Sequence, residues 1–346
     1  MSSGNYSFKE LIREIPKAEI HLHLEGLISV DTIWNLVQEN HLEFDGSDSK
    51  ENLKKRFNVN SLDEFISLFL NVIQSSFRKE QDIVHLITDA QNYLVRNNIV
   101  YAEIFFAPSK FVQSGFSFPH MADILEAGSK KIFEESNITV KFLVDVSRTF
   151  GPENAEQNLD LVINNPRKSI IGIGLGGAES KGPAADYKAV FERAIKNNLK
   201  VVAHAGEDIG PESIWAALKD LNVDRIGHGI SAIQDEELMT YLKDNQIPLE
   251  ICPTSNLFTK KYVQKIEEHP IKEFYNRGLY VTLNSDDPTL FSSDLCEEYE
   301  LLYENKIFTE DEIIDIMKKT VYAIYADEKV KKAIWKKAEK VIKKYR

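Results

Sequence analysis

Residues 199–230 read LKVVAHAGEDIGPESIWAALKDLNVDRIGHGI, and this stretch carries the pattern that decides the fold. It begins with a short apolar run, continues through a segment whose apolar residues have helical spacing, and returns to a second apolar run. Buried strands joined by a helix in this order are typical of parallel β-sheets. His204 and His228 each close one of the two runs and are followed by glycine within two residues.

The same strand-and-helix unit recurs along the chain. Patterns with helical spacing separate most of the apolar runs, and two runs in a parallel sheet need such a crossover. Eight units predict an α/β protein of the (β/α)8 TIM-barrel class, and a doubly wound open sheet is the alternative. The eight runs lie at residues 18–26, 100–109, 139–147, 169–177, 199–207, 224–230, 247–256 and 278–288.

The connection between the first two strands is too long for one helix and its loops. It spans about 75 residues, far more than a typical strand-to-helix connection. Within it, residues 61–77 are strongly amphipathic, with Phe65 and Phe69 one helical turn apart. We expect a helical lid insertion at about residues 27–98, over the barrel mouth. No Pro/Gly-rich linker divides the chain, so residues 1–346 are predicted to form a single domain.

The composition narrows the class of partner. The net charge of the 346 residues is −12, and no cluster of lysine and arginine alternates with aromatic residues, so a nucleic acid is not expected. No apolar stretch approaches the length of a membrane span, and the first 19 residues lack the apolar core of a secretory signal. Two cysteines, Cys252 and Cys296, cannot make a disulfide framework. These features predict a cytoplasmic enzyme and leave its oligomeric state open.

Polar side chains gather where the predicted strands end, which is where barrel enzymes carry their chemistry. His21 and His23 are two residues apart on one strand, so both side chains face the same way. Taken singly, this pair could arise by chance, His204 could be a core histidine, and Asp286 could belong to a turn. Together, three imidazoles and one carboxylate match the ligand preferences of Zn²⁺. We therefore expect one zinc ion per chain.

Two further groups lie near these ligands. A bound zinc ion lowers the pKa of its water ligand from about 16 towards about 7, which provides hydroxide at neutral pH. His228 could accept the proton of that water or orient the hydroxide. Glu207 could donate a proton to a ring nitrogen, and the alternative is a surface carboxylate at the start of a helix. The remaining histidines fall in predicted helices or loops and are interpreted as incidental: His41, His85, His120 and His269.

The complete motif set resembles the adenosine/adenine deaminase family of the amidohydrolase superfamily. The motifs are HLHLEG, HAGE, GHG and NSDDP, in this order on the first, fifth, sixth and eighth strands. Connecting stretches also resemble the family, including GIGLGGAE, GPESIWAAL and ICPTSN, and the resemblance runs from Pro16 to the final helices. It implies hydrolytic deamination at C6 of a purine base or nucleoside, with release of ammonia.

The resemblance also implies roles for single residues. Glu207 would protonate purine N1, and His228 would position the attacking hydroxide. Asp287 would accept a hydrogen bond at N7, and the backbone of Gly177 would contact N3. By the same matching, the zinc ligands would be His21, His23, His204 and Asp286.

Three other residues are matched to the substrate itself. His23 would lie beside the substrate as well as the zinc ion. Phe65 and Phe69 align with the hydrophobic lid of the family, and their alternative is ordinary helix core. Glu25 stands where many adenosine deaminases have an aspartate that bonds the ribose 5′-hydroxyl. Because glutamate is one methylene longer, it would either shift the ribose or occupy its space. In the family this form is common among adenine deaminases and among bacterial deaminases of altered nucleosides.

Other features bear on the substrate. The second strand ends in FFAPS, unlike many adenosine deaminases, whereas the fourth ends in GLGGAES, which is closer to the nucleoside-type members. We therefore expect adenosine as the substrate, with adenine or 6-aminodeoxyfutalosine as alternatives. A binuclear amidohydrolase is a remote alternative, because Lys181 lies several residues beyond the strand end where a bridging carboxylated lysine would stand. The other remote alternative is a non-catalytic relative that binds a nucleoside.

Overall fold

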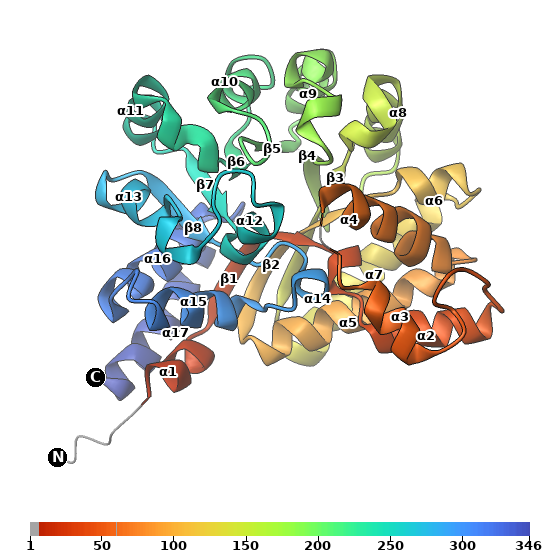
Figure 1. The fold of residues 1–346 in the computed structure, drawn as a ribbon, viewed down its shortest axis with the longest axis horizontal. Coiled ribbons are helices and arrows are strands. Elements are labelled where there is room, and N and C mark those ends of the chain that lie inside the picture. The colour runs from red at the N-terminus through yellow and green to blue at the C-terminus, as the bar shows by residue number, and fades with distance from the viewer. Residues whose placement is uncertain (1–6, 60) are drawn as a thin grey trace.

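Eight parallel strands follow one another around the centre of the molecule (Figure 1). The computed structural model describes residues 7–59 and 61–346. An isolated parallel bridge between Leu22 and Asp286 brings the segment after the last strand against the first. The order is sequential, so the predicted (β/α)8 barrel is confirmed and the open doubly wound sheet is wrong. The strands are β1 (Lys17–His23), β2 (Ile99–Phe106), β3 (Thr139–Asp145), β4 (Ile170–Leu175), β5 (Lys200–Ala205), β6 (Arg225–His228), β7 (Pro248–Ile251) and β8 (Tyr280–Leu283).

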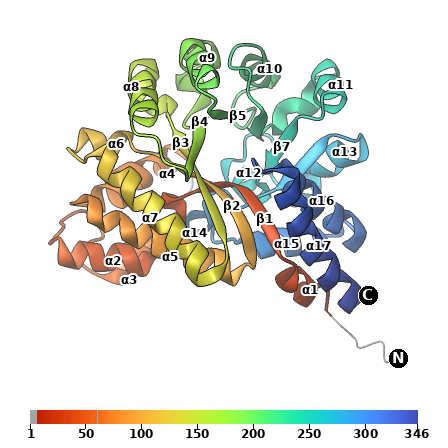
Figure 2. The same ribbon diagram turned by 180° about the vertical axis from the view of Figure 1, so that it is seen from behind.

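Helices surround the barrel on its outside, as the views from the two sides show (Figures 1 and 2). The last of this outer ring, α16, packs against both β8 and β1 and so covers the line where the barrel closes. Among the described residues, no helix combines the length and the apolar character needed to cross a membrane. The outer helices are α5 (Ile83–Arg96), α7 (Phe118–Ser136), α8 (Gly151–Asn164), α9 (Lys188–Lys196), α10 (Pro211–Lys219), α11 (Glu236–Asp244), α13 (Ile271–Asn276) and α16 (Glu310–Ala323).

The remaining helices extend the barrel at its rim and its ends. Two of them, α12 and α14, are single short segments that follow β7 and β8 directly. Their positions after the strands place them at the C-terminal end of the barrel, beside the functional side chains. The remaining helices are α1 (Phe8–Glu14), α2 (Val30–Glu39), α3 (Lys50–Arg56), α4 (Leu62–Leu68), α6 (Ser109–Gln113), α12 (Pro253–Thr259), α14 (Pro288–Phe291), α15 (Leu295–Glu304) and α17 (Glu328–Tyr345).

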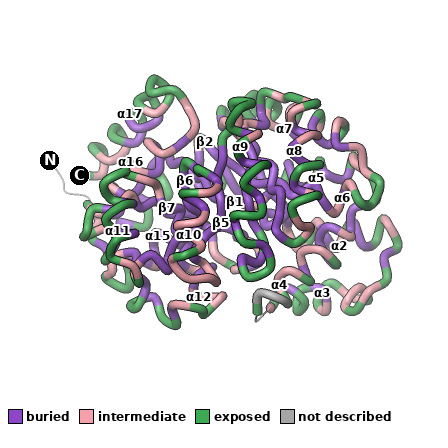
Figure 3. The backbone as a smooth tube through the Cα atoms, turned by 90° about the horizontal axis from the view of Figure 1, so that it is seen from above, coloured by how far each residue is buried: buried purple, intermediate pink, exposed green. Residues whose placement is uncertain are grey.

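The strands are buried on both faces, which explains their almost continuous apolar sequences (Figure 3). The barrel interior also contains a buried ionic group. Nη2 of Arg225 lies 2.6 Å from Oε2 of Glu103, and its Nε lies 2.6 Å from Oε1 of Glu250. Buried charges are tolerated when they are paired in this way. This group connects β2, β6 and β7 beneath the barrel mouth.

The long connection between β1 and β2 contains α2, α3 and α4 before the outer-ring helix α5. Each of the three begins at a serine whose hydroxyl accepts a hydrogen bond from the first helical turn: Ser29, Ser49 and Ser61. Helix α5 packs against β2 and α7, as an outer-ring helix does. The segment that exceeds a minimal barrel therefore ends just before Ile83, and α4 lies near α12 and α14 in Figure 1.

Candidate active site

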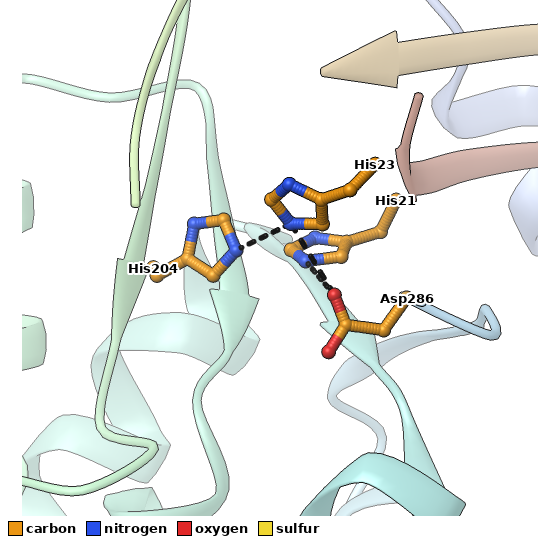
Figure 4. Close-up of side chains that lie close together, drawn as sticks. All are labelled: His21, His23, His204 and Asp286. Carbon is orange, nitrogen blue, oxygen red and sulfur yellow. Dashed lines mark hydrogen bonds and ion pairs between the residues drawn. The ribbon is translucent and has the colours of Figure 1, made fainter. Parts of the chain in front are cut away.

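Four side chains from the first, fifth and eighth strand ends meet at the barrel mouth (Figure 4). Nε2 of His23 lies 3.2 Å from Nε2 of His204. Nε2 of His21 and of His23 lie 3.5 and 3.3 Å from Oδ1 of Asp286. One ligand atom from each of the four residues lies within 4.8 Å of the others. The structure thus brings together all four residues that the sequence predicted as ligands.

Local backbone structure places these side chains. The His21 ring packs over Gly227 in β6, where an added Cβ would lie only 2.8 Å from Cε1 of His21. Asp286 has a left-handed backbone, with φ of 65°, which costs a non-glycine residue about 1–3 kcal/mol. Its backbone is held by β1, since its N–H donates to His21 and its carbonyl accepts from His23. The aspartate is therefore fixed to the same strand as two of the histidines.

The four side chains fit a divalent metal ion. Nε2 of His21 is buried and has no hydrogen-bond partner among the described residues, and leaving such an atom unpaired is costly. Nδ1 of His21 lies 2.7 Å from Oε2 of Glu250, so it donates there and leaves the lone pair of Nε2 available to an ion. Burial alone would raise the pKa of Asp286, but the neighbouring imidazoles of His21 and His23 lower it well below its usual value. The carboxylate is therefore ionised, as a ligand must be.

Glu207 and His228 line the same cavity as His23, His204 and Asp286. Oε2 of Glu207 lies 3.5 Å from Nε2 of His228. Burial, and then the neighbouring Asp286 carboxylate, raise the pKa of Glu207 well above its usual value. Burial lowers the pKa of His228 to about 3. The site therefore combines a carboxyl group that keeps its proton with a neutral imidazole.

Glu207 stands on a loop that a second carboxylate holds in place. The backbone N–H groups of Gly206, Glu207 and Asp208 donate to Glu179 over 2.8, 2.7 and 3.0 Å. The hydroxyl of Ser213 donates to the same side chain. Charged acceptors bind backbone donors strongly, so Glu179 fixes the start of this loop and hence the position of the Glu207 side chain.

The predicted substrate-binding residues divide into two groups. Those that line the cavity are His23, Phe65, Phe69, Gly177 and Asp287. The rings of Phe65 and Phe291 stack with centroids 5.6 Å apart. Glu25 belongs to the other group.

Glu25 lies behind the cavity wall. It is fully buried, and its Oε1 accepts hydrogen bonds from Nε2 of Gln74 over 3.0 Å and from the backbone of Ala107 over 3.1 Å. Gln74 and Ala107 are lining residues, whereas Glu25 is not. Its remaining oxygen, Oε2, is buried and lacks a hydrogen-bond partner in the part of the chain that the structure describes. Gln74 thus stands between Glu25 and the cavity.

Sequence reasoning missed residues that support the site from behind. Gln74, Glu179 and Glu250 lie on a lid segment, a loop and a neighbouring strand, and nothing in the local sequence of each indicates what it contacts. In the sequence, Asn256 is only part of the ICPTSN motif, yet its Nδ2 lies 3.1 Å from Nδ1 of His228. His269, interpreted as incidental, is buried, and its Nε2 lies 3.2 Å from Oδ1 of Asn256.

An eight-stranded barrel whose mouth joins three imidazoles, an ionised carboxylate and a protonated carboxyl group defines a metal-dependent hydrolase. Comparison with known proteins narrows this class. Residues 16–341 match the family model described as adenosine deaminase. The chain belongs to the adenosine deaminase family, within the amidohydrolase superfamily, and is a hydrolase that acts on carbon–nitrogen bonds.

Three relatives illustrate the breadth of this family. The chain is 34% identical to an aminodeoxyfutalosine deaminase of Streptomyces avermitilis, over 91% of this chain and 88% of that protein. It is 36% identical to an adenine deaminase of Pseudomonas savastanoi pv. phaseolicola, over 87% and 94% of the two chains. The crystal structure of an adenine deaminase from Arthrobacter aurescens superimposes with a TM-score of 0.90 at 26% identity and covers 95% of this chain and 99% of its own. These relatives act on adenine-type substrates by name, and neither of the two activities named is adenosine deamination.

Proposed function

We propose that this chain is a mononuclear zinc hydrolase that removes the 6-amino group of an adenine-type purine as ammonia, with free adenine as its preferred substrate. The observation that carries the reaction is Glu207, a largely buried carboxyl group whose raised pKa keeps it protonated within the ligand cavity. When bound, a zinc ion held by the three histidines and Asp286 supplies hydroxide at neutral pH.

The residues of the chain provide the remaining steps. Glu207 donates its proton to purine N1, which makes C6 electrophilic, and His228 orients the attacking oxygen. Burial raises the pKa of Asp287 well above its usual value. Because N7 of a purine offers a lone pair to a donor, we propose that a protonated Asp287 donates a hydrogen bond to N7, the reverse of the direction expected from the sequence. Gly177 also lines the cavity, and we propose that its backbone contacts N3.

The contacts of Glu25 support free adenine over adenosine. An aspartate at this position would meet the ribose 5′-hydroxyl, but the glutamate uses Oε1 for Gln74 and Ala107 and lies behind them. Gln74 then occupies the wall where the hydroxyl would bind. The expected preference for adenosine is accordingly replaced by one of its stated alternatives. Of the relatives named above, the adenine deaminase supports this choice, and the aminodeoxyfutalosine deaminase supports the second candidate below.

The lining of the cavity also disfavours a nucleotide. None of the described residues that line it is a lysine or an arginine. A phosphate group is usually bound by such cations, above all by the planar guanidinium of arginine. The cavity instead suits an uncharged purine, held by proton donors on one side and aromatic rings on the other.

A second candidate substrate is aminodeoxyfutalosine, which is bulkier than adenine. The outer part of the cavity is formed by the rings of Phe65, Phe258 and Phe291, whose centroids lie 5.2 to 6.4 Å apart. These rings belong to three different helices and offer an apolar surface beyond the purine. We propose that α4, which carries Phe65, acts as a lid over this part of the cavity.

A substrate panel tests the proposal. Ammonia release and the loss of adenine absorbance are followed for zinc-loaded enzyme with adenine, adenosine and aminodeoxyfutalosine, with a Glu207→Gln preparation as the control. We expect the highest kcat/KM with adenine. A higher value with aminodeoxyfutalosine would establish the second candidate, and a higher value with adenosine would overturn the argument from Glu25. Ammonia release from none of the three would refute the proposed reaction.

A further inference from the structure

The hydrogen-bond chain behind His228 begins at a group whose polarity is fixed. The backbone N–H of Ile271 lies 3.1 Å from Nδ1 of His269. A backbone N–H can only donate, so this nitrogen of His269 must accept and carries no proton. His269 is buried, and burial lowers its pKa to about 3, so the ring is neutral. Its single proton is therefore on Nε2.

The proton on Nε2 of His269 in turn fixes the orientation of the Asn256 side-chain amide. Nε2 of His269 lies 3.2 Å from Oδ1 of Asn256, which accepts the proton. The opposite orientation of the amide would place an NH₂ group against Nε2, and His269 would then have to accept at both nitrogens. A neutral imidazole always carries one proton, so that orientation is excluded. The NH₂ group of Asn256 must accordingly face His228.

His228 receives this donor at Nδ1, over 3.1 Å. A nitrogen that accepts a hydrogen bond has no proton, so a neutral His228 carries its proton on Nε2. That nitrogen faces the cavity, 3.5 Å from Oε2 of Glu207 and 4.0 Å from Oδ2 of Asp286. The backbone of Ile271, at the start of α13, thus determines which nitrogen of His228, at the end of β6, is protonated.

We propose that the chain Ile271–His269–Asn256–His228 fixes His228 as its Nε2–H tautomer, so that it acts in the site as a hydrogen-bond donor and not as a base. Asn256 and His269 are then positioning residues, although His269 looks incidental in the sequence. The assignment of the tautomer is independent of the substrate. Its consequence for catalysis rests on the proposed function, because a donor at this place holds the attacking oxygen and cannot first take its proton.

The same tautomer bears on the number of metal ions. His228, Cys252 and Asp286 form a second group that could hold an ion by distance alone. A nitrogen that carries a proton has no lone pair for a metal ion. With Nδ1 engaged by Asn256, His228 cannot serve as a ligand of a second ion. The hydrogen-bond chain therefore favours a single ion per chain over the binuclear alternative.

Nitrogen NMR of the full chain, labelled with ¹⁵N-histidine, tests the tautomer with and without zinc. The His228 signals are identified by their loss in His228→Gln. We expect Nε2 to be protonated and Nδ1 unprotonated in both states. A proton on Nδ1, or the loss of the Nε2 proton on addition of zinc, would overturn the proposal. The tautomer is read from the wild-type chain, and the His228→Gln variant serves only to assign its signals.

Variants test the source of the tautomer. Asn256→Asp places an acceptor against Nδ1, so we expect a proton to appear there and kcat to fall about 10- to 100-fold with a smaller change in KM. His269→Gln can still donate to Asn256 and should keep the wild-type tautomer, whereas His269→Leu should not. Asn256→Asp with the wild-type spectrum would contradict the assignment. A wild-type spectrum without deamination of any purine would refute the proposed function but leave the tautomer standing.

A zinc titration tests the stoichiometry. We expect one ion per chain, lost in His21→Ala. A second ion that disappears in Cys252→Ser would show that His228 does offer a lone pair and would overturn the tautomer.

Discussion

Nδ1 of His21 and Oε2 of Glu250 lie 2.7 Å apart, and both side chains are completely buried. This pair orients the His21 ring so that its other nitrogen faces the ligand cluster. Glu250 is in turn held by Arg225, which also pairs with Glu103. The position of one ligand is therefore set by an ionic group that spans three other strands.

Replacing Glu250 tests this support. We expect Glu250→Ala to weaken zinc binding about 10- to 100-fold, because the His21 ring loses the acceptor that fixes it. Glu250→Gln keeps an amide oxygen at the same place and should lose less. Competition with a chelator of known affinity measures both. Thermal unfolding of the zinc-free variants provides the control, since a general loss of stability would appear there as well. Equal zinc affinity in wild type and Glu250→Ala would contradict the assigned role.

The Glu207→Gln variant tests proton donation without removing a proposed metal ligand. The amide cannot donate as an acid, so we expect kcat to fall about 10²- to 10⁴-fold while the zinc content stays that of the wild type. Glu212→Gln, on helix α10 of the same strand-to-helix connection, is the matched control and should keep wild-type activity. Steady-state kinetics with metal analysis checks both variants. Retained turnover in Glu207→Gln would exclude it as the proton donor.

The pH dependence follows from the raised pKa of Glu207. The protonated form is the active one, so kcat/KM should fall as the pH rises through that pKa. The Glu179 carboxylate contributes to the shift, after burial and Asp286. Glu179→Gln removes this negative charge and should move the alkaline limb to lower pH. A pH–rate profile of the two proteins measures the shift, and a limb that moves to higher pH would argue against Glu207 as the titrating group.

Glu25→Asp tests the origin of the substrate preference. The shorter side chain cannot reach Gln74 and Ala107 as the glutamate does, so the wall behind the cavity loosens and space opens for a ribose. We expect kcat/KM for adenosine relative to adenine to rise about 10-fold, the scale of discrimination that one methylene provides. Competition between the two substrates gives this ratio directly. An unchanged ratio would place the determinant elsewhere in the cavity.

Removal of the metal should destabilise the fold. An ion that binds only the native state adds about 2.7 kcal/mol at a free concentration 100 times its dissociation constant. We expect chelation to lower Tm and zinc to restore it. His23→Ala should lose the response to zinc, whereas His85→Ala, on helix α5 and away from the cluster, should keep it. A Tm that does not respond to zinc in the wild type would count against the site.

The sequence predicts the barrel, and the meeting of His21, His23, His204 and Asp286 at its mouth, because both depend on local patterns. Each strand is an apolar run with buried faces. In a barrel, a polar residue at the C-terminal end of such a run lies at the barrel mouth. His21 and His23 follow from the two-residue period of one strand. Asp286 follows from the order of the motifs.

The supporting residues depend on contacts that no local pattern contains. Glu250 lies within an apolar run, and only the closed barrel places its carboxylate against His21. His269 stands in a loop, where a histidine is usually incidental, and its role requires the particular approach of Asn256. The sequence predicts Glu25 as a substrate-binding residue. Its position behind the cavity wall depends on Gln74, which reaches it from the long insertion. Predicting these residues requires the three-dimensional arrangement of segments remote in sequence.

The backbone bridge between Leu22 and Asp286 has a consequence for protein synthesis. His21 and His23 leave the ribosome early, but Asp286 follows only after most of the chain has been made. A nascent chain therefore cannot assemble the complete cluster until the segment after its eighth strand has emerged, and a fragment that ends before Asp286 lacks one of the four side chains. Catalytic competence can therefore arise only after Asp286 has been made, when the two edges of the sheet meet.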